Sequence, residues 1–427
     1  MSVLHVVKRR KPKSRVLGQV KVVRREDFDG LDLNAKVEFI RNLAQVGMLR
    51  VQEMLDENLL ALAGPRHARG DQWAGSRHGS NPGSVFLAGQ RVPVKVPRVR
   101  GPEGEIPLEA YQALHERGTQ ADELLLKRVL YGISCRNYEA AAEAIPGAIG
   151  LSSSTVSRQF VAASAAKLRS FQERDLGGED IVALFLDGKA FADDMMVVAL
   201  GIRITGEKVF LGFVQTDTEN EKVLTPFLRS LLSRGMDISQ GLLVVIDGSK
   251  GLRSSVKKAF RGRAVVQRCT WHKRENIVSY LAKSEQAFWR RRLQLALDRP
   301  TEAEARRQLM SLHKELEEKN QSAAASLMEG LEEILTLHRL GVYGVLGRSF
   351  KTTNCIESVN AAVEERCLKI DSWKNSSQKE RWLVAALLDI EPRMHRVMGY
   401  KNLPKLRAAI MCELKVEAVE QSSEMVA

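Results

Sequence analysis

The sequence predicts a mixed α/β core that is interrupted by an all-α insertion and preceded by a mainly α N-terminal region with a small β unit. The core is predicted because short β-branched runs alternate with helical patterns from residue 181 to residue 269. The insertion is predicted because residues 271–340 are helical in pattern, highly charged and without a strand candidate. The N-terminal region combines apolar residues at helical spacing with a valine-rich segment punctuated by Gly and Pro.

The composition indicates a globular protein with a polyanionic partner. The 427 residues include 65 Lys and Arg against 52 Asp and Glu, a formal net charge of +13, and 44% are hydrophobic. No apolar run approaches the roughly 18–20 residues that cross a bilayer, so we expect no membrane protein. Nucleic acid is the simplest partner for this charge. The alternative is a basic protein whose charge serves only solubility.

The cysteines and the N-terminus indicate a cytoplasmic location. The chain has only five cysteines, a small and odd number that argues against a disulfide framework in a chain of this length. The N-terminus reads MSVLHVVKRRKPKSR, in which a short apolar piece precedes the basic one. A secretory signal has the reverse order, so we expect a reducing cytosol.

The first 120 residues are expected to bind DNA or to dimerise. Residues 1–30 form a basic arm, a composition typical of a solvated segment that contacts phosphates. Residues 31–120 are predicted to contain a helix over 33–62, a loop over 64–83 and then a β-hairpin or ribbon. The outward face of this ribbon would carry Arg91, Lys95, Arg98 and Arg100. The arm residues predicted to bind DNA are Arg9, Arg10, Lys11, Lys13 and Arg15.

Residues 121–175 have the pattern of a helix-turn-helix region. An amphipathic segment over 136–145, a glycine-containing turn and a serine-rich helix start at 152–158 follow one another. An ordinary corner of two helices with a serine cap gives the same pattern, and the basic composition favours DNA. The DNA contacts predicted here are Arg136, Ser154, Thr155 and Arg158.

Residues 176–272 are predicted to form the strand-rich first part of the core. Three meandering strands followed by alternating helix and strand is the element order of an RNase H-like domain. The all-α insertion (273–345), a second part of the core (346–400) and a C-terminal tail (401–427) follow, with a glycine break over 341–347. The expected elements are strands over 181–188, 195–204 and 208–216, a helix over 220–234, a strand over 242–248, a helix over 252–260, a strand over 264–269, and helices from 353 and over 378–398.

Two strand candidates end in the same dipeptide, Asp187-Gly188 and Asp247-Gly248. Ligands gather beyond the carboxyl ends of strands in an open sheet, and neighbouring carboxylates resist joint ionisation unless a cation lies between them. Mg²⁺ or Mn²⁺ suits such an all-oxygen site, and two ions support phosphoryl transfer. The alternative is simpler, because Asp-Gly is a common turn and Asp a common helix cap.

A third acid is expected at the start of the helix from residue 353. Asn354, Glu357 and Asn360 are spaced by three and therefore share one helical face. Taken alone, this stretch could be a capped surface helix. In company with the two aspartates, Glu357 is better interpreted as a third metal ligand, with the two amides holding phosphate oxygens or water.

These motifs resemble the Mutator-type transposases of bacterial insertion sequences. The resembling segments cover about residues 120–400 and keep the family's order and its long gap between Asp247 and Glu357. One departure is Gly188-Lys189, where the family usually has a small residue such as Ala directly after the first Asp. The segments are Asp187-Gly188, 201–206, 211–213, 232–235, Val245-Ile246-Asp247-Gly248, Gly251-Leu252, Gln267-Arg268-Cys269-Thr270-Trp271-His272, Arg274-Glu275-Asn276 and 353–360.

The resemblance implies a metal-dependent DNA transposase on an RNase H-like catalytic core. It implies a triad of Asp187, Asp247 and Glu357 with two Mg²⁺ or Mn²⁺ ions, acting on terminal inverted repeats and target DNA. A homodimer or higher homo-oligomer in the bacterial cytoplasm, associated with the nucleoid, is implied as well. Residues expected to support the site are Gln267, Cys269, His272, Asn354 and Asn360. Arg268 and Arg274 are expected to contact DNA.

Several alternatives stay open at this point. Cys269 and His272 match the family's Cys-x-x-His motif and could also be half of a zinc site, although no second pair with ligand spacing follows nearby. ATP is not expected, because residues 248–251 lack the Gly-Lys-Ser/Thr ending of a P-loop. His313 and His338 are expected at the surface. The rival functions are an RNase H-like nuclease or resolvase without strand transfer, and a non-catalytic helix-turn-helix regulator.

Overall fold

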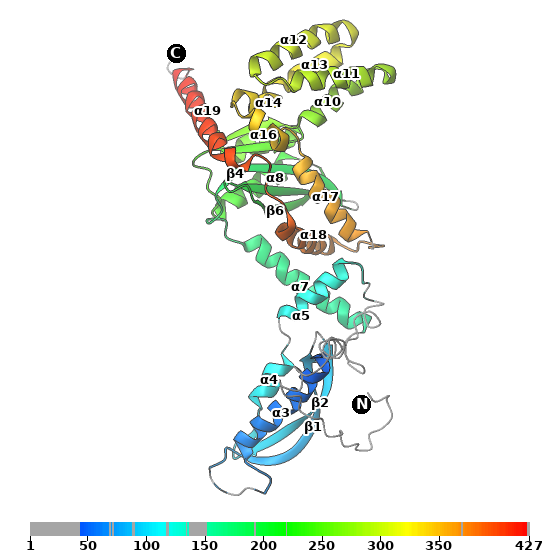
Figure 1. Ribbon diagram of the computed structural model, residues 1–427, viewed down its shortest axis with the longest axis vertical. Helices are drawn as coiled ribbons and strands as arrows, with labels where there is room; N and C mark the ends of the chain where they lie inside the picture. Colours follow the sequence, from blue (N-terminus) through cyan, green and yellow to red (C-terminus); the bar gives the residue numbers. More distant parts are fainter. Residues whose placement is uncertain are drawn as a thin grey trace, which may run out of the picture. The chain divides into compact units, whose positions relative to one another are not determined.

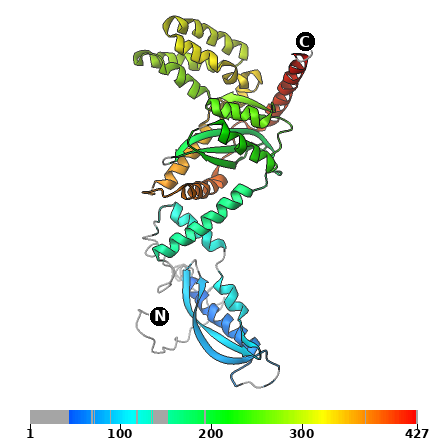
Figure 2. The same ribbon diagram turned by 180° about the vertical axis from the view of Figure 1, so that it is seen from behind.

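The chain divides into two compact units, Met1–Ser164 and Ala165–Ala427, and the boundary falls inside helix α7 (Ser153–Glu173). Figures 1 and 2 show the elements from two sides. The basic arm, with its predicted DNA contacts, and Arg136 lie outside the described residues. In the described part of the chain no helix is long and apolar enough to cross a membrane. The computed structural model describes residues 43–67, 70, 72–87, 90–116, 119–133, 135, 152–191, 194–218, 220–368 and 370–424.

The N-terminal unit contains the predicted β ribbon as a three-stranded antiparallel sheet in the order β1-β2-β3. Its core joins buried residues of helix α3, such as Leu55, to Val85 and Val99 of the sheet. The first strand begins at Ser76, inside the segment 64–83 that the sequence predicts as a loop. The polar residues there show no alternation, yet they pair with the second strand. The elements are α3 (Leu43–Ala63), β1 (Ser76–Leu87), β2 (Gln90–Gly101), β3 (Gly104–Ile106), α4 (Glu109–His115) and α5 (Thr119–Leu130).

The second unit is built on a five-stranded mixed sheet in the order β6-β5-β4-β7-β8. The three strands β4, β5 and β6 form the predicted antiparallel meander, and β7 and β8 are added in parallel beside β4. All five strands match runs that the sequence predicts, with ends that differ by a few residues. They are β4 (Ile181–Phe191), β5 (Asp194–Arg203), β6 (Lys208–Thr216), β7 (Leu242–Ile246) and β8 (Ala264–Arg268).

Helices cover both faces of this sheet (Figure 1). On one face, α8 (Glu221–Ser233) and α9 (Lys250–Phe260) bury leucine, valine and phenylalanine side chains against alternate strand residues. The other face packs against the later helices α16 to α19. Buried apolar side chains on both faces explain why the strands are nearly continuous hydrophobic runs. The later helices on this second face are α16 (Tyr343–Phe350), α17 (Asn354–Cys367), α18 (Ser376–Ile390), the short η1 (Glu391–Arg393) and η2 (Tyr400–Asn402), and α19 (Leu403–Glu424).

Between β8 and α16 the chain is helical, as the sequence predicts. Helices α10 to α14 share a hydrophobic core of their own, with Trp289 completely buried in it. The amphipathic patterns therefore serve packing among these helices and not burial against the sheet. The helices are α10 (Thr270–Ser279), α11 (Lys283–Leu297), α12 (Glu302–Lys319), α13 (Gln321–Glu329), α14 (Leu331–Ile334) and α15 (Thr336–Arg339).

Two expectations about this part of the chain are wrong. The glycine break over 341–347 is largely helix α16, because Leu346 and Phe350 are buried in the core beside the sheet. His338, expected at the surface, is 5% exposed and stacks on Tyr343, with its Nε2 2.9 Å from the Arg299 carbonyl. Further along, most of the predicted C-terminal tail (401–427) belongs to helix α19, whose Leu403 and Ile410 are buried.

Candidate active site

The two predicted aspartates come from neighbouring strands of the sheet. The parallel pairing of β4 with β7 sets Phe185 opposite Val245. Asp187 lies two residues beyond Phe185 inside β4, which continues to Phe191, and Asp247 lies two residues beyond Val245, directly after the end of β7. Side chains alternate along a strand, so Asp187 shares the face of Phe185, which is the face packed by α17. Asp247 therefore lies at the carboxyl end of its strand, whereas Asp187 lies within β4.

Helix α17, which carries the third predicted acid, contacts Asp187. Asn360 is 8% exposed, and its Nδ2 donates a 2.8 Å hydrogen bond to Asp187 Oδ2. Glu357 lies one turn earlier on the same helical face, and Asn354 is exposed at the start of the helix. Lys189 adds a second link from β4, since its Nζ donates to the Asn360 carbonyl at 3.1 Å and to Glu364 at 2.6 Å.

The Cys-x-x-His motif joins the other side of the site. Cys269 follows β8 directly, is completely buried, and its backbone N–H donates to the Ile246 carbonyl at 2.7 Å, one residue before Asp247. His272 lies one turn into α10, with its Nε2 3.9 Å from Glu357 Oε1. The motif thus lies between Asp247 and Glu357, as the sequence interpretation of a supporting role expects.

The charges of this motif are coupled. A hydrogen bond to the Cys269 side chain raises the pKa of His272 to about 9. Burial lowers this pKa, whereas the negative charges of Glu357 and Asp247 help to raise it. Burial raises the pKa of Cys269, but hydrogen bonds from His272 and Thr353 outweigh it and leave that pKa below its ordinary value. A positively charged imidazole is therefore favoured beside Glu357 at neutral pH.

Two residues expected to act at the site are used elsewhere. Gln267 is completely buried, and its side chain bonds the Ile334 carbonyl and the Leu337 N–H, so it fastens α14 and α15 to β8. Arg268 is 5% exposed, and its Nη1 lies 2.7 Å from Glu329. The charge of Arg268 is thus paired and its surface covered in this structure, and its contact with DNA stays a prediction. Basic character in the sequence does not reveal such burial.

Other predicted DNA contacts keep partial exposure. Arg274 is half-buried and bonds Glu275 and Gln294. Ser154 and Arg158 are exposed on the first turns of α7, and the half-buried Thr155 accepts a 3.0 Å hydrogen bond from Ser152. These contacts stay predictions.

A hydrogen bond from a neutral donor reaches one oxygen of each of the three acids. Asn360 donates to Asp187 at 2.8 Å, the Ser249 N–H donates to Asp247 at 2.9 Å, and Thr353 Oγ1 donates to Glu357 at 2.6 Å. Within the described ranges, no group of three or more His, Cys, Asp or Glu side chains is close enough to hold a metal ion.

The sequence interpretation assigned no role to Ser249 or Thr353. A serine or threonine at the start of a helix is explained equally well as a helix cap, so the sequence gives no signal for a role at the site.

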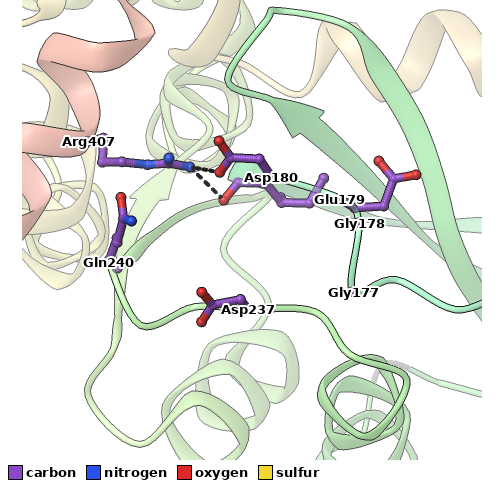
Figure 3. Close-up of a pocket in the computed structure, with 9 residues that line it drawn as sticks. Gly177, Gly178, Glu179, Asp180, Asp237, Gln240 and Arg407 are labelled. Atoms are coloured by element: carbon purple, nitrogen blue, oxygen red, sulfur yellow. Dashed lines mark hydrogen bonds and ion pairs between the residues drawn. The ribbon is translucent and has the colours of Figure 1, made fainter.

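A separate pocket lies at the opposite, amino end of the strands. It has a volume of about 250 Å³ and is lined by residues 177–181, Asp237, Gln240, Gly241 and Arg407. Figure 3 shows Arg407 reaching from α19 to Asp180 and to the Ile181 carbonyl, at 2.5 and 3.4 Å. Asp237 accepts hydrogen bonds from the N–H and hydroxyl of Ser239. Arg407 is thus paired with Asp180, and Asp237 is hydrogen-bonded to Ser239. We therefore do not place the chemistry in this pocket.

The fold and this site define an α/β protein with two aspartates from neighbouring strands of a mixed sheet and a glutamate on a helix that contacts one of them. The chain belongs to the Mutator family of transposases, whose family model matches residues 18–396. Transposases are enzymes that process DNA.

Individual relatives agree with the family. The chain is 26% identical over 375 residues to the transposase for insertion sequence element IS905 of Lactococcus lactis subsp. lactis, covering 85% of this chain and 92% of that protein. It is 28% identical over 317 residues to the transposase for IS256 in transposon Tn4001 of Staphylococcus aureus, covering 70% and 76%. A third relative, the transposase for IS6120 of Mycolicibacterium smegmatis, is 28% identical over 251 residues, covering 57% and 76%.

Proposed function

We propose that this chain is the transposase of an insertion sequence, which binds the terminal inverted repeats of its own element and cuts and joins DNA through Asp187, Asp247 and Glu357. One observation carries the proposal. Asp187 lies on β4 and Asp247 directly after the parallel neighbour β7, and the bond from Asn360 to Asp187 links the helix that carries Glu357 to β4.

The order of the sheet supports an RNase H-like core. An antiparallel meander of three strands, extended by two parallel strands and covered by helices on both faces, is the arrangement expected from that element order. The helical segment between β8 and α16 then interrupts the core between Asp247 and Glu357.

Three carboxylates supply the oxygen donors that Mg²⁺ or Mn²⁺ prefers. Each is already oriented by a hydrogen bond from a neutral donor, as metal-ligating carboxylates are. The three carboxylates are therefore the type of donor that divalent ions prefer, although within the described ranges no three such side chains are close enough to hold an ion in this structure. When bound, two such ions would supply Lewis-acid activation of the attacking oxygen and stabilisation of the leaving oxygen in phosphoryl transfer.

The protein's own residues orient this chemistry. Asn360 fixes Asp187, the Ser249 N–H fixes Asp247, and Thr353 fixes Glu357. In the first reaction a water oxygen attacks a phosphate at the element's end, the bond to the leaving 3′ oxygen breaks, and a 3′-OH is exposed. In the second, that 3′-OH attacks target or flanking DNA, so one phosphodiester forms as another breaks. No covalent protein intermediate is needed.

DNA binding rests on the exposed basic residues of the N-terminal unit and of α7. Lys95, Arg100 and Arg158 are exposed, and the basic arm adds further charge in the sequence. Recognition of the element's ends must be sequence-selective, whereas contacts to target DNA can rely on phosphate charge. Binding is therefore expected to weaken steeply as salt rises. The transposase is proposed to act as a homodimer or higher homo-oligomer without ATP.

The test uses the purified chain, a labelled duplex carrying the element's end, and Mg²⁺ or Mn²⁺. Glu357→Gln is nearly isosteric, so we expect it to abolish cleavage and to leave end binding within about twofold of the unchanged protein. Glu365→Gln is the matched control, because Glu365 is exposed on the same helix, and it is expected to cut normally.

The outcomes separate the rival functions. Cleavage without joining of a supplied 3′-OH end would identify a nuclease or resolvase. End binding with no cleavage by the unchanged protein, or cleavage that survives Glu357→Gln, would contradict the proposed role of the carboxylates. Inverted repeats that flank the gene, bounded by short direct repeats, would support the transposase independently of any protein chemistry.

A further inference from the structure

Thr353 occupies the cap position of α17 but does not cap it. A threonine at this position usually accepts a hydrogen bond from a backbone N–H of the first helical turn. Here the Thr353 side chain makes no such bond, and its backbone has φ −81° and ψ 6° in place of the extended conformation that is usual for a cap. The residue is completely buried. Its hydroxyl is therefore used for something other than the helix start.

The hydroxyl faces three groups of the candidate site. Thr353 Oγ1 donates to Glu357 Oε1 at 2.6 Å, which is the shortest of its contacts. The same oxygen lies 3.4 Å from Cys269 Sγ and 3.4 Å from His272 Nδ1. One hydroxyl has a single proton and two acceptor lone pairs. The hydroxyl can donate a hydrogen bond to the carboxylate at the shorter distance or to the Cys269 sulfur at the longer one, and its lone pairs can accept a hydrogen bond from His272 Nδ1.

A second contact fixes Thr353 itself to the sheet. Its backbone N–H lies 3.4 Å from Cys269 Sγ, within the range for a hydrogen bond to sulfur. Cys269 is in turn held by its N–H to the Ile246 carbonyl at 2.7 Å, one residue before Asp247. A continuous series of contacts thus runs from the edge that carries Asp247, through Cys269 and Thr353, to Glu357.

We propose that Thr353 is a positioning residue, which holds the Glu357 carboxylate at a fixed place relative to Asp247 by using Cys269 as its support. This inference rests on the proposed function and extends it to the Cys-x-x-His motif. Cys269 and His272 then act as the sheet-side support of this hydroxyl and need no zinc. Outer partners that orient ligating carboxylates typically change activity or metal affinity 10–100-fold when removed.

The test compares Thr353→Val with Thr353→Ser. Valine keeps the shape and the backbone N–H but lacks the hydroxyl, whereas serine keeps the hydroxyl and lacks a methyl. Single-turnover cleavage of a saturating element-end duplex is measured together with the Kd for that duplex and the Tm. The affinity of the DNA-free protein for Mn²⁺ alone is measured by electron paramagnetic resonance of the free ion.

We expect Thr353→Val to lower the cleavage rate and the Mn²⁺ affinity by about 10–100-fold, with the duplex Kd unchanged. Thr353→Ser is expected to stay within about threefold for both quantities. Cleavage by Thr353→Val at the normal rate would overturn the proposal. Equal losses in both variants would also overturn it, since they would indicate a packing role for the methyl group.

A second pair of variants covers the case in which valine impairs folding. Cys269→Ala removes the sulfur, and Cys269→Ser keeps a polar atom there, so only the alanine variant is expected to lose cleavage, by about tenfold. Equal rates in this pair would contradict the support role of Cys269. The Glu357→Gln variant distinguishes failure of the proposed function from failure of the role of Thr353. If Glu357→Gln still cleaves DNA, the proposed function is wrong. If Glu357→Gln is inactive while Thr353→Val cleaves normally, only the proposed role of Thr353 is wrong.

Discussion

The acidic residues at the two ends of the central sheet have different hydrogen-bond donors. At the amino end, Asp180 pairs with Arg407 at 2.5 Å, and Glu179 receives Arg203, with one of the two contacts at 2.9 Å. At the carboxyl end, the hydrogen bonds to Asp187, Asp247 and Glu357 come from an amide, a backbone N–H and a hydroxyl. Neutral donors orient a carboxylate without cancelling its charge.

The basic residues nearest the carboxyl end are directed elsewhere. Arg268, the last residue of β8, and Lys273 on α10 both bond Glu329 Oε2, at 2.7 and 2.6 Å. Both cations are almost fully buried. The acids named above at the amino end are thus paired with arginines, whereas the hydrogen bonds named at the carboxyl end come from neutral donors, and the imidazole of His272 lies 3.9 Å from Glu357.

The largest effect should separate Asp247→Asn from Asp180→Asn. Loss of a metal-binding charge removes several kcal/mol of transition-state stabilisation, so Asp247→Asn should slow cleavage roughly 10³-fold with little change in Tm. Asp180 is 57% exposed at its side chain, so its exposed ion pair is worth less than about 1 kcal/mol. Asp180→Asn should therefore cut normally. Single-turnover cleavage and thermal unfolding check both, and equal cleavage rates in the two variants would remove the distinction between the ends.

Glu329→Gln should have an intermediate effect, and it should act on stability. Gln keeps an acceptor oxygen but removes the carboxylate that bonds both buried cations, Arg268 and Lys273, and leaves Glu333 as a countercharge near them. Because the Glu329 side chain is 43% exposed and solvent screens it, the loss should be roughly 1–2 kcal/mol, below the value for a fully buried pair. Urea unfolding of this variant and of Glu318→Gln, an exposed residue of α12, gives the comparison. The same variants test Arg268 as a DNA contact: a change in the salt dependence of end binding, without a loss of stability, would contradict its structural role.

Much of this arrangement could be predicted from the sequence, for identifiable reasons. Strands such as 242–246 are short, continuous apolar runs, and an Asp directly after such a run lies at the edge where ligands bind. The role of Thr353 could not be predicted, because its partner Cys269 is far along the chain and a threonine at a helix start is common. The burial of Arg268 could not be predicted either, because a basic residue in the sequence reveals charge and not burial.

The glycine-rich stretch before α17 shows a different limit of sequence reasoning. Three glycines in residues 341–347 predict a break. Two of them lie in α16 nevertheless, because packing of Leu346 and Phe350 against the sheet side of the core outweighs their low helix propensity. Tertiary burial decides such short segments.

Gly248→Ala should also have an intermediate effect on stability, because the turn after Asp247 requires a glycine for two reasons. Its φ is +107°, and an added Cβ would lie 1.9 Å from Arg268 Nε. Strain and the displaced guanidinium together should cost about 2 kcal/mol. Gly262→Ala is the matched control, because its φ is +75° but nothing lies within 4 Å of an added Cβ. Equal losses of stability in the two variants would show that Arg268 does not pack on the turn.

The smallest effect concerns the pH dependence of stability at the amino end. The hydrogen bond from Arg203 holds the pKa of Glu179 below its usual value in the folded protein. The unfolded chain then binds more protons between the two pKa values, so stability is complete above the unfolded pKa of about 4.3 and falls as the pH drops through the folded one. Because solvent screens this pair, the contribution should not exceed about 1 kcal/mol. Urea unfolding between pH 6 and pH 3.5 should therefore show a shallower acid loss for Glu179→Gln than for the unchanged protein.

A double variant decides whether Arg203 causes this dependence. In an Arg203→Met background, Glu179→Gln should no longer alter the slope of stability with pH, since the charge that lowers the pKa of Glu179 is gone. A slope that Glu179→Gln changes equally in both backgrounds would contradict the assignment to this ion pair. The ion pair with Arg203 would then not be what sets Glu179 apart from the acids of the carboxyl end, whose named hydrogen bonds come from neutral donors.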